Sequence, residues 1–453
     1  MYYTRLIDRD LIEWASRPFH KPLLLRGARQ VGKSWAVRHL GENFDFFAEI
    51  NFERQPGFKK VFAKDLIPQR IVAELSALTG KRIEQGRTLL FLDEIQECPE
   101  ALMSLRFFKE EMPGLHVVAA GSLLEIALES LPTFGVGRIH SMFMYPMTFD
   151  EFLMAAGENR LLEARNAANA ANPLPEVLHA RLVALVRTYM LVGGMPEAVA
   201  CWVRTGDYIS CQEIQDDLIV SYEADFAKYK AKVNPEVLRR TLHSVAVQAT
   251  SKFVFSDVGG GFRIDEVKKA LELLILAGIC VGVERTAANG LPLGSEADAS
   301  QRKILMFDTG LTLRLLNMTL GDVSSLTADI LTADTAELVN RGPMAEMMAG
   351  LEMQRYGSPN LRTGLYYWAR AAKNSQAEVD YVIARAGAVL PVEVKAGMRG
   401  GMKSLWLFMR EKHLTEAVRC SLENFGSFDY VDEQDGGTVR HVSVCPLYAI
   451  SQM

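Results

Sequence analysis

The N-terminal third of the sequence alternates short apolar runs with stretches of helical periodicity. Apolar residues fill nearly all positions of 23–25, 88–92 and 116–120. Such uninterrupted runs are typical of strands buried on both faces of a parallel sheet. Between them, residues 65–78 carry apolar positions three or four residues apart, as an amphipathic helix does. The pattern therefore predicts an α/β domain built on a parallel sheet.

Helical periodicity without strands dominates the next segment. Residues 159–230 are rich in Ala and Leu, and the loop Gly193-Gly194-Met195-Pro196 interrupts them. Glycine and proline end one helix and set the direction of the next. We expect this segment to form a helical lid of the α/β domain, with the Gly-Gly pair as a structural turn.

A third pattern, from about residue 235, resembles a winged helix. It predicts an amphipathic helix over 264–274 and wing strands over 280–285 and 302–307. The helix carries two lysines that could contact DNA phosphates, at 268 and 269. It also carries acids at 265, 266 and 272, which DNA would repel. A domain that only packs between its neighbours is therefore the alternative.

A glycine-rich loop directly follows the first apolar run. Residues 27–34 read Gly-Ala-Arg-Gln-Val-Gly-Lys-Ser, and a helical pattern begins at Trp35. A strand, a G-x-x-x-x-G-K-S loop and a helix in this order are the context of a phosphate-binding P-loop. Backbone N–H groups of such a loop surround the phosphates, and the helix N-terminus adds positive potential. The sequence therefore predicts a nucleoside triphosphate site.

Side chains of this loop and of a later strand would supply the chemistry. Lys33 is placed to reach the β- and γ-phosphates, and the Ser34 hydroxyl to hold Mg²⁺. The run 88–92 ends in Asp93 and Glu94, at the sheet edge where ligands bind in α/β proteins. We expect Asp93 to hold Mg²⁺ with Ser34, and Glu94 to polarise the attacking water. The predicted nucleotide-binding residues are Gly27, Ala28, Arg29, Gln30, Val31, Gly32, Lys33, Ser34 and Asp93.

The apolar run 116–120 ends in Gly121 and Ser122. A polar side chain at the end of this strand can reach the γ-phosphate or the attacking water, so Ser122 is the candidate sensor and a predicted catalytic residue. The alternative is that Ser122 caps the helix that follows, because serine is a favoured N-cap residue.

Composition and charge limit the number of domains, the possible partners and the cellular compartment that we expect. The chain has 453 residues, a net charge of −5, 49% hydrophobic residues and 23% charged residues. This length suits two to four domains, and no global basic field points to nucleic acid. The six cysteines form no C-x-x-C pair, which fits a reducing compartment. Without a signal-peptide pattern or a run long enough to span a bilayer, we expect a cytoplasmic protein with no membrane partner.

The order of P-loop, Asp-Glu strand and sensor strand resembles that of AAA+ ATPases. The continuation, Gly137-Arg138 and then Tyr-Pro-Met-Thr-Phe-Asp-Glu-Phe over 145–152, is similar to a family of prokaryotic AAA-type ATPases with a C-terminal domain of unknown function. The likeness covers essentially the whole chain and includes the Gly-Gly-Met-Pro loop. It implies ATP binding and hydrolysis with Mg²⁺, in a module related to origin-recognition and archaeal STAND-like ATPases.

The same resemblance carries a role over to Arg138. An arginine at this position could stabilise transition-state charge, either within its own subunit or in a neighbouring subunit of a homo-oligomer. Arg138 is therefore a predicted catalytic residue, and a surface ion pair is the equally open alternative.

The last segment places charged residues on predicted strands. Strand patterns cover 366–370, 378–383 and 389–395. Period-two alternation points Glu393 and Lys395 to one face, where Asp380 of the preceding strand could meet them. Asp, about a dozen residues and then Glu-x-Lys resembles the arrangement of restriction-endonuclease-like, PD-(D/E)xK folds.

This arrangement predicts a second metal site. Two carboxylates would bind Mg²⁺, or Mn²⁺, and Lys395 would position or deprotonate the attacking water. The family pattern adds Glu346 to the metal ligands Asp380 and Glu393, and the predicted catalytic residues are Asp380, Glu393 and Lys395. The alternative is a structural ion pair of Lys395 with Asp380 or Glu393, in a domain that binds without cleaving.

The sequence thus predicts four parts: an AAA+ P-loop core over 1–155, a helical lid over 156–234, a winged-helix-like domain over 235–320 and a restriction-endonuclease-like α/β domain over 334–453. Two functions follow. One is an ATP-hydrolysing enzyme that acts on DNA with a metal-dependent nuclease domain. The other is a nucleotide-controlled switch or scaffold whose C-terminal domain binds a partner without cleavage. The sequence indicates neither a DNA target, a pathway nor an oligomeric state.

Overall fold

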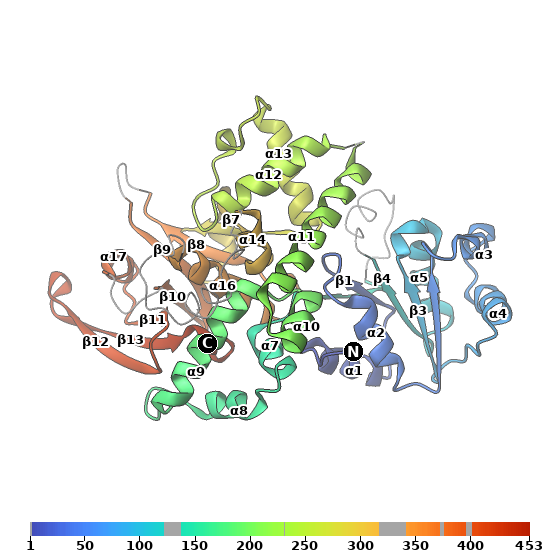
Figure 1. The fold of residues 1–453 in the computed structure, drawn as a ribbon, viewed down its shortest axis with the longest axis horizontal. Coiled ribbons are helices and arrows are strands. Elements are labelled where there is room, and N and C mark those ends of the chain that lie inside the picture. Colours follow the sequence, from blue (N-terminus) through green and yellow to red (C-terminus); the bar gives the residue numbers. More distant parts are fainter. Residues whose placement is uncertain (1, 122–136, 231, 317–340, 372–375, 396–400) are drawn as a thin grey trace. The chain divides into compact units, whose positions relative to one another are not determined.

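The computed structural model describes residues 2–121, 137–230, 232–316, 341–371, 376–395 and 401–453 (Figure 1). The chain forms two compact units. Unit 1 comprises residues 1–147, 276–279 and 358–362, and unit 2 comprises 148–275, 280–357 and 363–453. Of the helices in the described ranges, none is both long and apolar enough to cross a membrane.

Unit 1 is built on a five-stranded sheet whose neighbouring strands are all parallel, in the order β2-β3-β4-β1-β5. This confirms the predicted α/β domain with a parallel sheet. The strands are β1 (Leu23–Arg26), β2 (Phe46–Asn51), β3 (Thr88–Asp93), β4 (His116–Ala120) and β5 (His140–Phe143). The helices are α1 (Ile7–Ser16), α2 (Lys33–Gly41), α3 (Lys59–Lys64), α4 (Pro68–Thr79) and α5 (Pro99–Glu111).

The core of unit 1 explains the uninterrupted apolar runs. All six residues of β3 are buried, because helices cover both faces of a parallel sheet. Leu90 and Leu92 belong to one apolar cluster that also contains Ile71, Leu102 and Leu105 from α4 and α5. The helices α3, α4 and α5 pack against one another beside this sheet (Figure 1). The packing fixes the end of β3, where the predicted catalytic acids begin.

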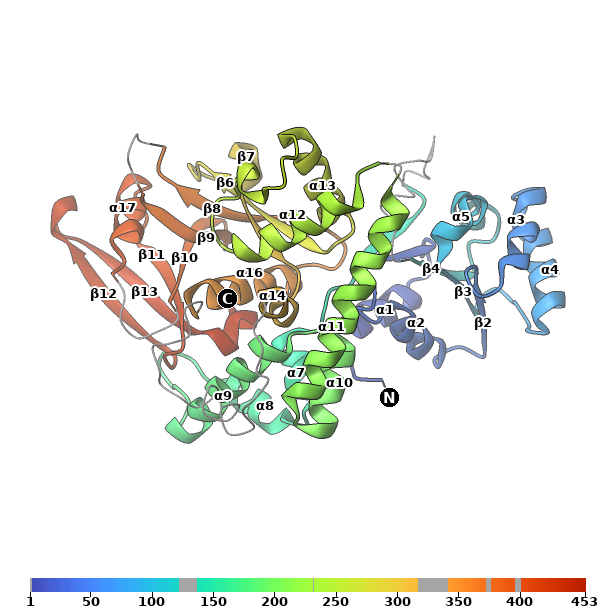
Figure 2. The same ribbon diagram turned by 45° about the horizontal axis from the view of Figure 1, so that its top comes forward.

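Unit 2 combines helices with one eight-stranded mixed sheet in the order β12-β13-β11-β10-β9-β8-β6-β7. The strands are β6 (Cys280–Thr286), β7 (Ala297–Met306), β8 (Leu365–Ala369), β9 (Glu378–Arg385), β10 (Ala388–Val394), β11 (Glu416–Ser421), β12 (Gly426–Asp432) and β13 (Thr438–Pro446). The helices are α7 (Phe149–Ala155), α8 (Asn159–Ala167), α9 (Glu176–Val192), α10 (Pro196–Thr205), α11 (Tyr208–Asp225), α12 (Pro235–Val247), α13 (Ile264–Leu276), α14 (Thr309–Leu315), α16 (Arg341–Arg355) and α17 (Lys403–Glu411). Figure 2 shows α12, α14 and α16 against this sheet, where α12 and α14 contact β7 and α16 contacts β10.

The sheet of unit 2 joins strands that the sequence assigned to different domains. The predicted wing strands are β6 and β7, and the predicted endonuclease-like strands begin with β8. Because β6 pairs in parallel with β8, with Val283 opposite Leu365, all these strands share one sheet. The sequence pattern marked the segment between them as a change of domain, whereas the hydrogen-bonding ladder runs across it. The winged-helix-like and restriction-endonuclease-like folds stay predictions.

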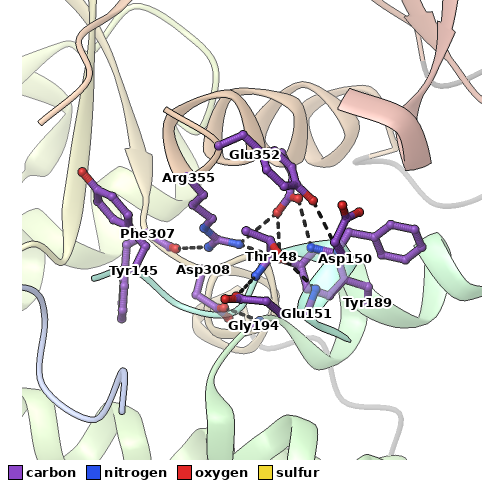
Figure 3. A network of polar contacts seen from close by, with 12 residues as sticks. Tyr145, Thr148, Asp150, Glu151, Tyr189, Gly194, Phe307, Asp308, Glu352 and Arg355 are labelled. Atoms are coloured by element: carbon purple, nitrogen blue, oxygen red, sulfur yellow. Dashed lines mark hydrogen bonds and ion pairs between the residues drawn. The ribbon is translucent and has the colours of Figure 1, made fainter. Parts of the chain in front are cut away.

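Two sequence landmarks, residues 148–152 and the Gly-Gly-Met-Pro loop, meet in a buried polar network of unit 2 (Figure 3). Glu352 of α16 accepts hydrogen bonds from the Phe149 N–H at 3.0 Å and from the Tyr189 hydroxyl at 2.9 Å. Arg355 donates to the Tyr189 hydroxyl at 2.5 Å and to the Phe307 carbonyl at 2.7 Å. We call Phe149, Tyr189, Phe307, Glu352 and Arg355 the α16 network. It ties α7, α9 and the end of β7 to one helix.

Helix capping and backbone conformation explain why these two landmarks contain threonine, glutamate and glycine. Thr148 and Glu151 form a capping box that satisfies free N–H groups at the start of α7. Asp308, which caps α14, accepts a hydrogen bond from the Gly194 N–H at 2.7 Å. A Cβ atom on Gly193, whose φ is +75°, would lie 2.2 Å from a carboxylate oxygen of Asp308. Only glycine fits there, as the turn predicted from the sequence requires.

Candidate functional site

The P-loop sequence lies between β1 and α2, at the carboxyl end of the first strand. Gly27 has φ +147°, and a Cβ atom there would lie 2.1 Å from the Met144 carbonyl oxygen. Gly32 precedes α2 with φ +101°, in the left-handed region. Both conformations favour glycine, so the two glycines of the motif shape the backbone of this loop.

Lys33 begins α2 and is buried against the loop that precedes it. Its ammonium donates hydrogen bonds to the carbonyl oxygens of Gly27 at 2.9 Å and Ala28 at 2.7 Å. Burial lowers the pKa of Lys33 to about 8, although the Glu94 and Asp93 carboxylates oppose this shift. The cation thus lies inside the loop, close to the backbone that would surround phosphate groups.

The remaining predicted loop residues lie between these glycines, and an arginine from the N-terminal segment supports them. Gln30 has φ +63°, a left-handed backbone conformation that is uncommon for residues other than glycine. Arg5 is buried and donates hydrogen bonds to the Val31 carbonyl at 2.8 Å and the Tyr145 carbonyl at 2.7 Å. Sequence reasoning missed Arg5, because nothing in the sequence connects an isolated basic residue with a loop over twenty positions away.

The structure brings Ser34 and Asp93 together, although 59 positions separate them. The Ser34 hydroxyl lies 3.1 Å from each carboxylate oxygen of Asp93. The Asn51 amide, at the end of β2, donates to the same carboxylate at 3.0 Å. Burial and then the neighbouring Glu94 carboxylate raise the pKa of Asp93. A hydroxyl and a buried carboxylate are oxygen donors that suit Mg²⁺, and sequence reasoning missed the supporting amide of Asn51.

Glu94 follows β3 in a conformation that is uncommon for a side chain with a Cβ atom. Its φ and ψ are +50° and +45°, and such strain is frequent at functional sites. The Gln96 amide donates a hydrogen bond to the Glu94 carboxylate at 2.6 Å. A Cβ atom on Gly121 would lie 2.0 Å from the Gln96 side-chain oxygen. The glycine that follows β4 therefore leaves room for the Gln96 side chain, which orients Glu94. The sequence did not predict the contact between Gln96 and Glu94.

Ser122 and Arg138 are the two other predicted catalytic residues of unit 1. Ser122 lies outside the described residues. Arg138 forms an ion pair with Glu110 of α5, and its side chain is 53% exposed. This pair is the contact expected from the alternative interpretation of Arg138, and the role of Arg138 in turnover stays a prediction.

The charged residues predicted in the C-terminal segment lie in unit 2: Glu346 on α16, Asp380 on β9, Glu393 on β10 and Lys395 directly after β10. The Lys395 ammonium lies 2.6 Å from a Glu393 oxygen, and Asp380 accepts a hydrogen bond from the Val394 N–H at 2.8 Å. Glu346 pairs at 2.7 Å with Lys303 of β7, which the sequence did not single out. The ammonium of Lys303 also lies 2.5 Å from Glu378. We call Lys303, Glu346, Glu378, Asp380, Glu393 and Lys395 the carboxylate cluster.

The charges of the carboxylate cluster act on one another. Burial raises the pKa of Glu346 to about 8, with Lys303 opposing the shift. Burial, followed by the Asp380 carboxylate, raises the pKa of Glu393 to about 7, with Lys395 opposing the shift. Burial therefore favours the protonated, neutral forms of Glu346 and Glu393.

The donor atoms of the carboxylate cluster suit a hard divalent cation, but ion pairs already engage several of them. One oxygen of Glu393, Oε2, is buried and has no hydrogen-bond partner in the described part of the chain. Buried polar atoms without a partner are rare in native proteins. Among the described residues, no group of three or more His, Cys, Asp or Glu side chains has the spacing of a metal site. The predicted C-terminal metal site therefore stays a prediction.

Comparisons with known protein families divide the chain into three matched regions. Residues 19–153 match the model of an AAA domain. Residues 183–322 match a domain of unknown function, DUF8612, and residues 341–445 match another, DUF4143. No curated protein matches the chain significantly. The first match covers the P-loop, β3 and β4, so unit 1 contains a P-loop AAA ATPase domain.

Several solved structures resemble the chain at low identity. The Walker-type ATPase of Pyrococcus abyssi is 16% identical with a TM-score of 0.44, over 70% of this chain and 96% of that one. The Orc1 protein of Aeropyrum pernix in complex with DNA is 13% identical with a TM-score of 0.30, over 69% of this chain and 92% of that one. The S. cerevisiae Hsp104–ADP complex is 12% identical with a TM-score of 0.25, over 60% of this chain and 37% of that one. Likenesses at these values do not identify the activity of this chain.

Proposed function

We propose that this chain, whose N-terminal unit contains a P-loop AAA ATPase domain, hydrolyses ATP at the site formed by residues 27–34, Asp93 and Glu94. The observation that carries the proposal is the contact of the Ser34 hydroxyl with both oxygens of Asp93, at 3.1 Å each. It joins the end of the P-loop to the end of β3, as binding of one Mg²⁺ by both residues requires.

Each residue has a distinct part in this proposal. The ammonium of Lys33 would neutralise charge on the β- and γ-phosphates, and Ser34 and Asp93 would hold Mg²⁺. When bound, Mg²⁺ supplies charge stabilisation between the phosphate oxygens. Glu94 would accept a hydrogen bond from the attacking water and polarise it. The hydrogen bond from Gln96 supports this part, because it fixes the direction of the Glu94 carboxylate.

The Glu94→Gln variant is expected to hydrolyse ATP about 10²–10⁴-fold more slowly than the wild type, because an amide polarises water poorly. ATP affinity should change little, since Lys33, Ser34 and Asp93 are intact. Phosphate release under saturating ATP and titration with a fluorescent ATP analogue measure the two quantities. Glu97→Gln is the matched control, because Glu97 is on the same segment but pairs with Lys59. Hydrolysis by Glu94→Gln at the wild-type rate would remove Glu94 from this role.

The carboxylate cluster of unit 2 supports a second function that concerns DNA. We propose that it binds Mg²⁺ or Mn²⁺ and that the chain cleaves DNA there, with Lys395 positioning the attacking water. The buried Oε2 atom of Glu393, which has no hydrogen-bond partner among the described residues, favours this proposal, since a cation would satisfy it. The ion pairs of Lys303 and Lys395 favour the alternative, a nucleotide-controlled switch or scaffold that binds a partner without cleaving it.

A cleavage assay separates the two. The wild type is incubated with linear, branched and single-stranded DNA and with Mg²⁺ or Mn²⁺. If the cluster is a nuclease site, Lys395→Ala should reduce cleavage by about 10²-fold or more, while Lys403→Ala, at an exposed lysine of α17, should leave it unchanged. If the wild type leaves every substrate intact, the non-cleaving scaffold is the better description.

A further inference from the structure

Strand β4 lies between the two strands that carry the nucleotide site. Leu25 of β1, the strand that leads into the P-loop, pairs in parallel with Ala120 of β4. On the other side, Leu92 of β3, the strand that leads to the catalytic acids, pairs in parallel with Ala119. Gly121 is buried and directly follows β4. Because the carboxyl ends of parallel strands meet at one edge of a sheet, Gly121 lies at the edge where the nucleotide site is built.

The side chain of Gln96 connects this end of β4 with Glu94. Its amide nitrogen, Nε2, donates a hydrogen bond to the Glu94 carboxylate at 2.6 Å. Its oxygen, Oε1, is buried beside Gly121 and has no hydrogen-bond partner in the part of the chain that the structure describes. Buried polar atoms without a partner are rare in native proteins, so this oxygen does little to hold the side chain in place. The position of Gln96 therefore depends on its bond to Glu94 and on the space beside Gly121.

A methyl group at residue 121 would displace Gln96 and little else. The atoms nearest to this methyl group would be Oε1 of Gln96 at 2.0 Å, Cδ of Gln96 at 3.2 Å and the backbone nitrogen of Ile95 at 3.6 Å. The contact with Ile95 is an ordinary van der Waals distance, whereas the contact with Oε1 is too short to exist. The backbone of Gly121 lies outside the left-handed region, so alanine would add no strain there. The end of the flexible Gln96 side chain would have to move instead.

Glu94 needs such support because its own backbone is strained. A residue with a Cβ atom persists at φ +50° and ψ +45° only when its surroundings hold it there. The hydrogen bond from Gln96 is one of these supports. Since a displacement of about 1 Å in a catalytic group can cost about 10²-fold in rate, the position of Gln96 matters for turnover.

We propose that the end of β4 controls ATP hydrolysis through Gln96. While Gln96 occupies the space beside Gly121, it holds the Glu94 carboxylate in the orientation that activates water. Displacement of Gln96 from this space slows hydrolysis without weakening ATP binding. The proposal rests on the role of Glu94 proposed above, and it makes Gln96 a positioning residue that is controlled from residue 121.

The test compares full-length wild type with Gly121→Ala, with Gln96→Ala and with the double variant. Each single substitution should lower kcat for ATP by about tenfold or more. The Kd of a fluorescent ATP analogue should stay within about twofold of the wild-type value, because Lys33, Ser34 and Asp93 are unchanged. In the double variant, Gly121→Ala should add nothing to the loss caused by Gln96→Ala, because there is no amide left to displace.

Two further variants separate the hydrogen bond from packing. Gln96→Met keeps the length of the side chain but lacks the donor, and it should be as slow as Gln96→Ala. Gln96→Ala added to Glu94→Gln should not slow hydrolysis beyond Glu94→Gln alone, because Gln96 acts through Glu94. If Gly121→Ala does not fold, Gln96→Ala and Gln96→Met decide the role of Gln96.

Matched controls come from the same unit. Gln69→Ala changes an exposed glutamine of α4, and Gly57→Ala adds a Cβ atom that would meet nothing within 4 Å. Both should hydrolyse ATP at the wild-type rate.

The outcomes distinguish this proposal from the ATPase proposal. Wild-type hydrolysis by Gln96→Ala and Gln96→Met, together with slow hydrolysis by Glu94→Gln, would overturn the role of Gln96 and leave the ATPase proposal standing. If Gly121→Ala caused the same loss with and without the Gln96 side chain, residue 121 would act by another route, and control through Gln96 would be wrong. Loss of ATP-analogue binding in proportion to the loss of kcat would also contradict a positioning role. Wild-type hydrolysis by Glu94→Gln would remove the premise of both proposals.

Discussion

Replacing Lys33 by alanine is expected to reduce ATP hydrolysis by about 10³-fold or more and to weaken ATP binding severely. The ammonium of Lys33 is inside the loop, within 2.9 Å of two backbone carbonyls, so its charge lies directly against the backbone that would surround the phosphates. Phosphate transfer depends mainly on positioning and charge stabilisation, which makes the loss larger than that of an exposed ion pair.

The measurement is ATP hydrolysis under saturating ATP, together with titration of a fluorescent ATP analogue. Lys60→Ala provides the control, because Lys60 is an exposed lysine of the same unit, on α3. Melting temperatures of both variants would show that they fold. If Lys33→Ala hydrolysed ATP at a rate within a few-fold of that of the wild type, the phosphates would not bind beside the Lys33 ammonium.

The nucleotide site of unit 1 could be predicted because its parts are contiguous in the sequence. The loop over 27–34 carries its own glycines, cation and hydroxyl, and β3 carries its own acids. Parallel strands place their carboxyl ends at one edge, so two local patterns were enough to predict that Ser34 and Asp93 meet. Asn51 and Gln96 could not be predicted, since single polar residues after a strand carry no pattern of their own.

The sheet of unit 2 shows what a local sequence pattern cannot predict, namely which strands lie side by side. Alternation along a strand indicates which residues share a face but not which strand lies beside it. The sequence therefore placed Asp380 and Glu393 on strands correctly, whereas Lys395 lies one residue after β10. It separated all three from Lys303, because β7 was assigned to a wing. The pairing of β6 with β8 is long-range information, which no local period contains.

The α16 network could not be predicted for a related reason. Glu352 and Arg355 are three positions apart on a helix, a spacing typical of exposed surface ion pairs. Both are buried instead, because Phe149, Tyr189 and Phe307 supply the partners that α16 lacks. The landmarks at 148–152 and 193–196 did carry information, since their capping and turn residues fix the segments that reach this network.

The Arg355→Met variant is expected to lose about 3–5 kcal/mol of stability, the cost of removing one partner from a buried ion pair. Arg355 contacts Glu352 at 3.2 Å, the Tyr189 hydroxyl and the Phe307 carbonyl, so methionine would leave three buried groups without this partner. Urea unfolding followed by circular dichroism measures the loss. Arg385→Met, at an exposed position at the end of β9, is the control and should change stability by less than about 0.5 kcal/mol.

The pH dependence of the Arg355→Met loss tests its cause. Burial raises the pKa of Glu352, and the Arg355 guanidinium is the main influence that opposes this rise. Without Arg355, the folded-state pKa should rise further above its unfolded value. A carboxyl with a raised pKa stabilises the fold below its unfolded pKa and loses that contribution as pH rises through the folded value. The deficit of Arg355→Met relative to the wild type should therefore be larger at pH 8 than at pH 5, and Glu352→Gln added to Arg355→Met should remove this dependence. A deficit that is the same at both pH values would mean that lost packing, and not an uncompensated Glu352 charge, destabilises the variant.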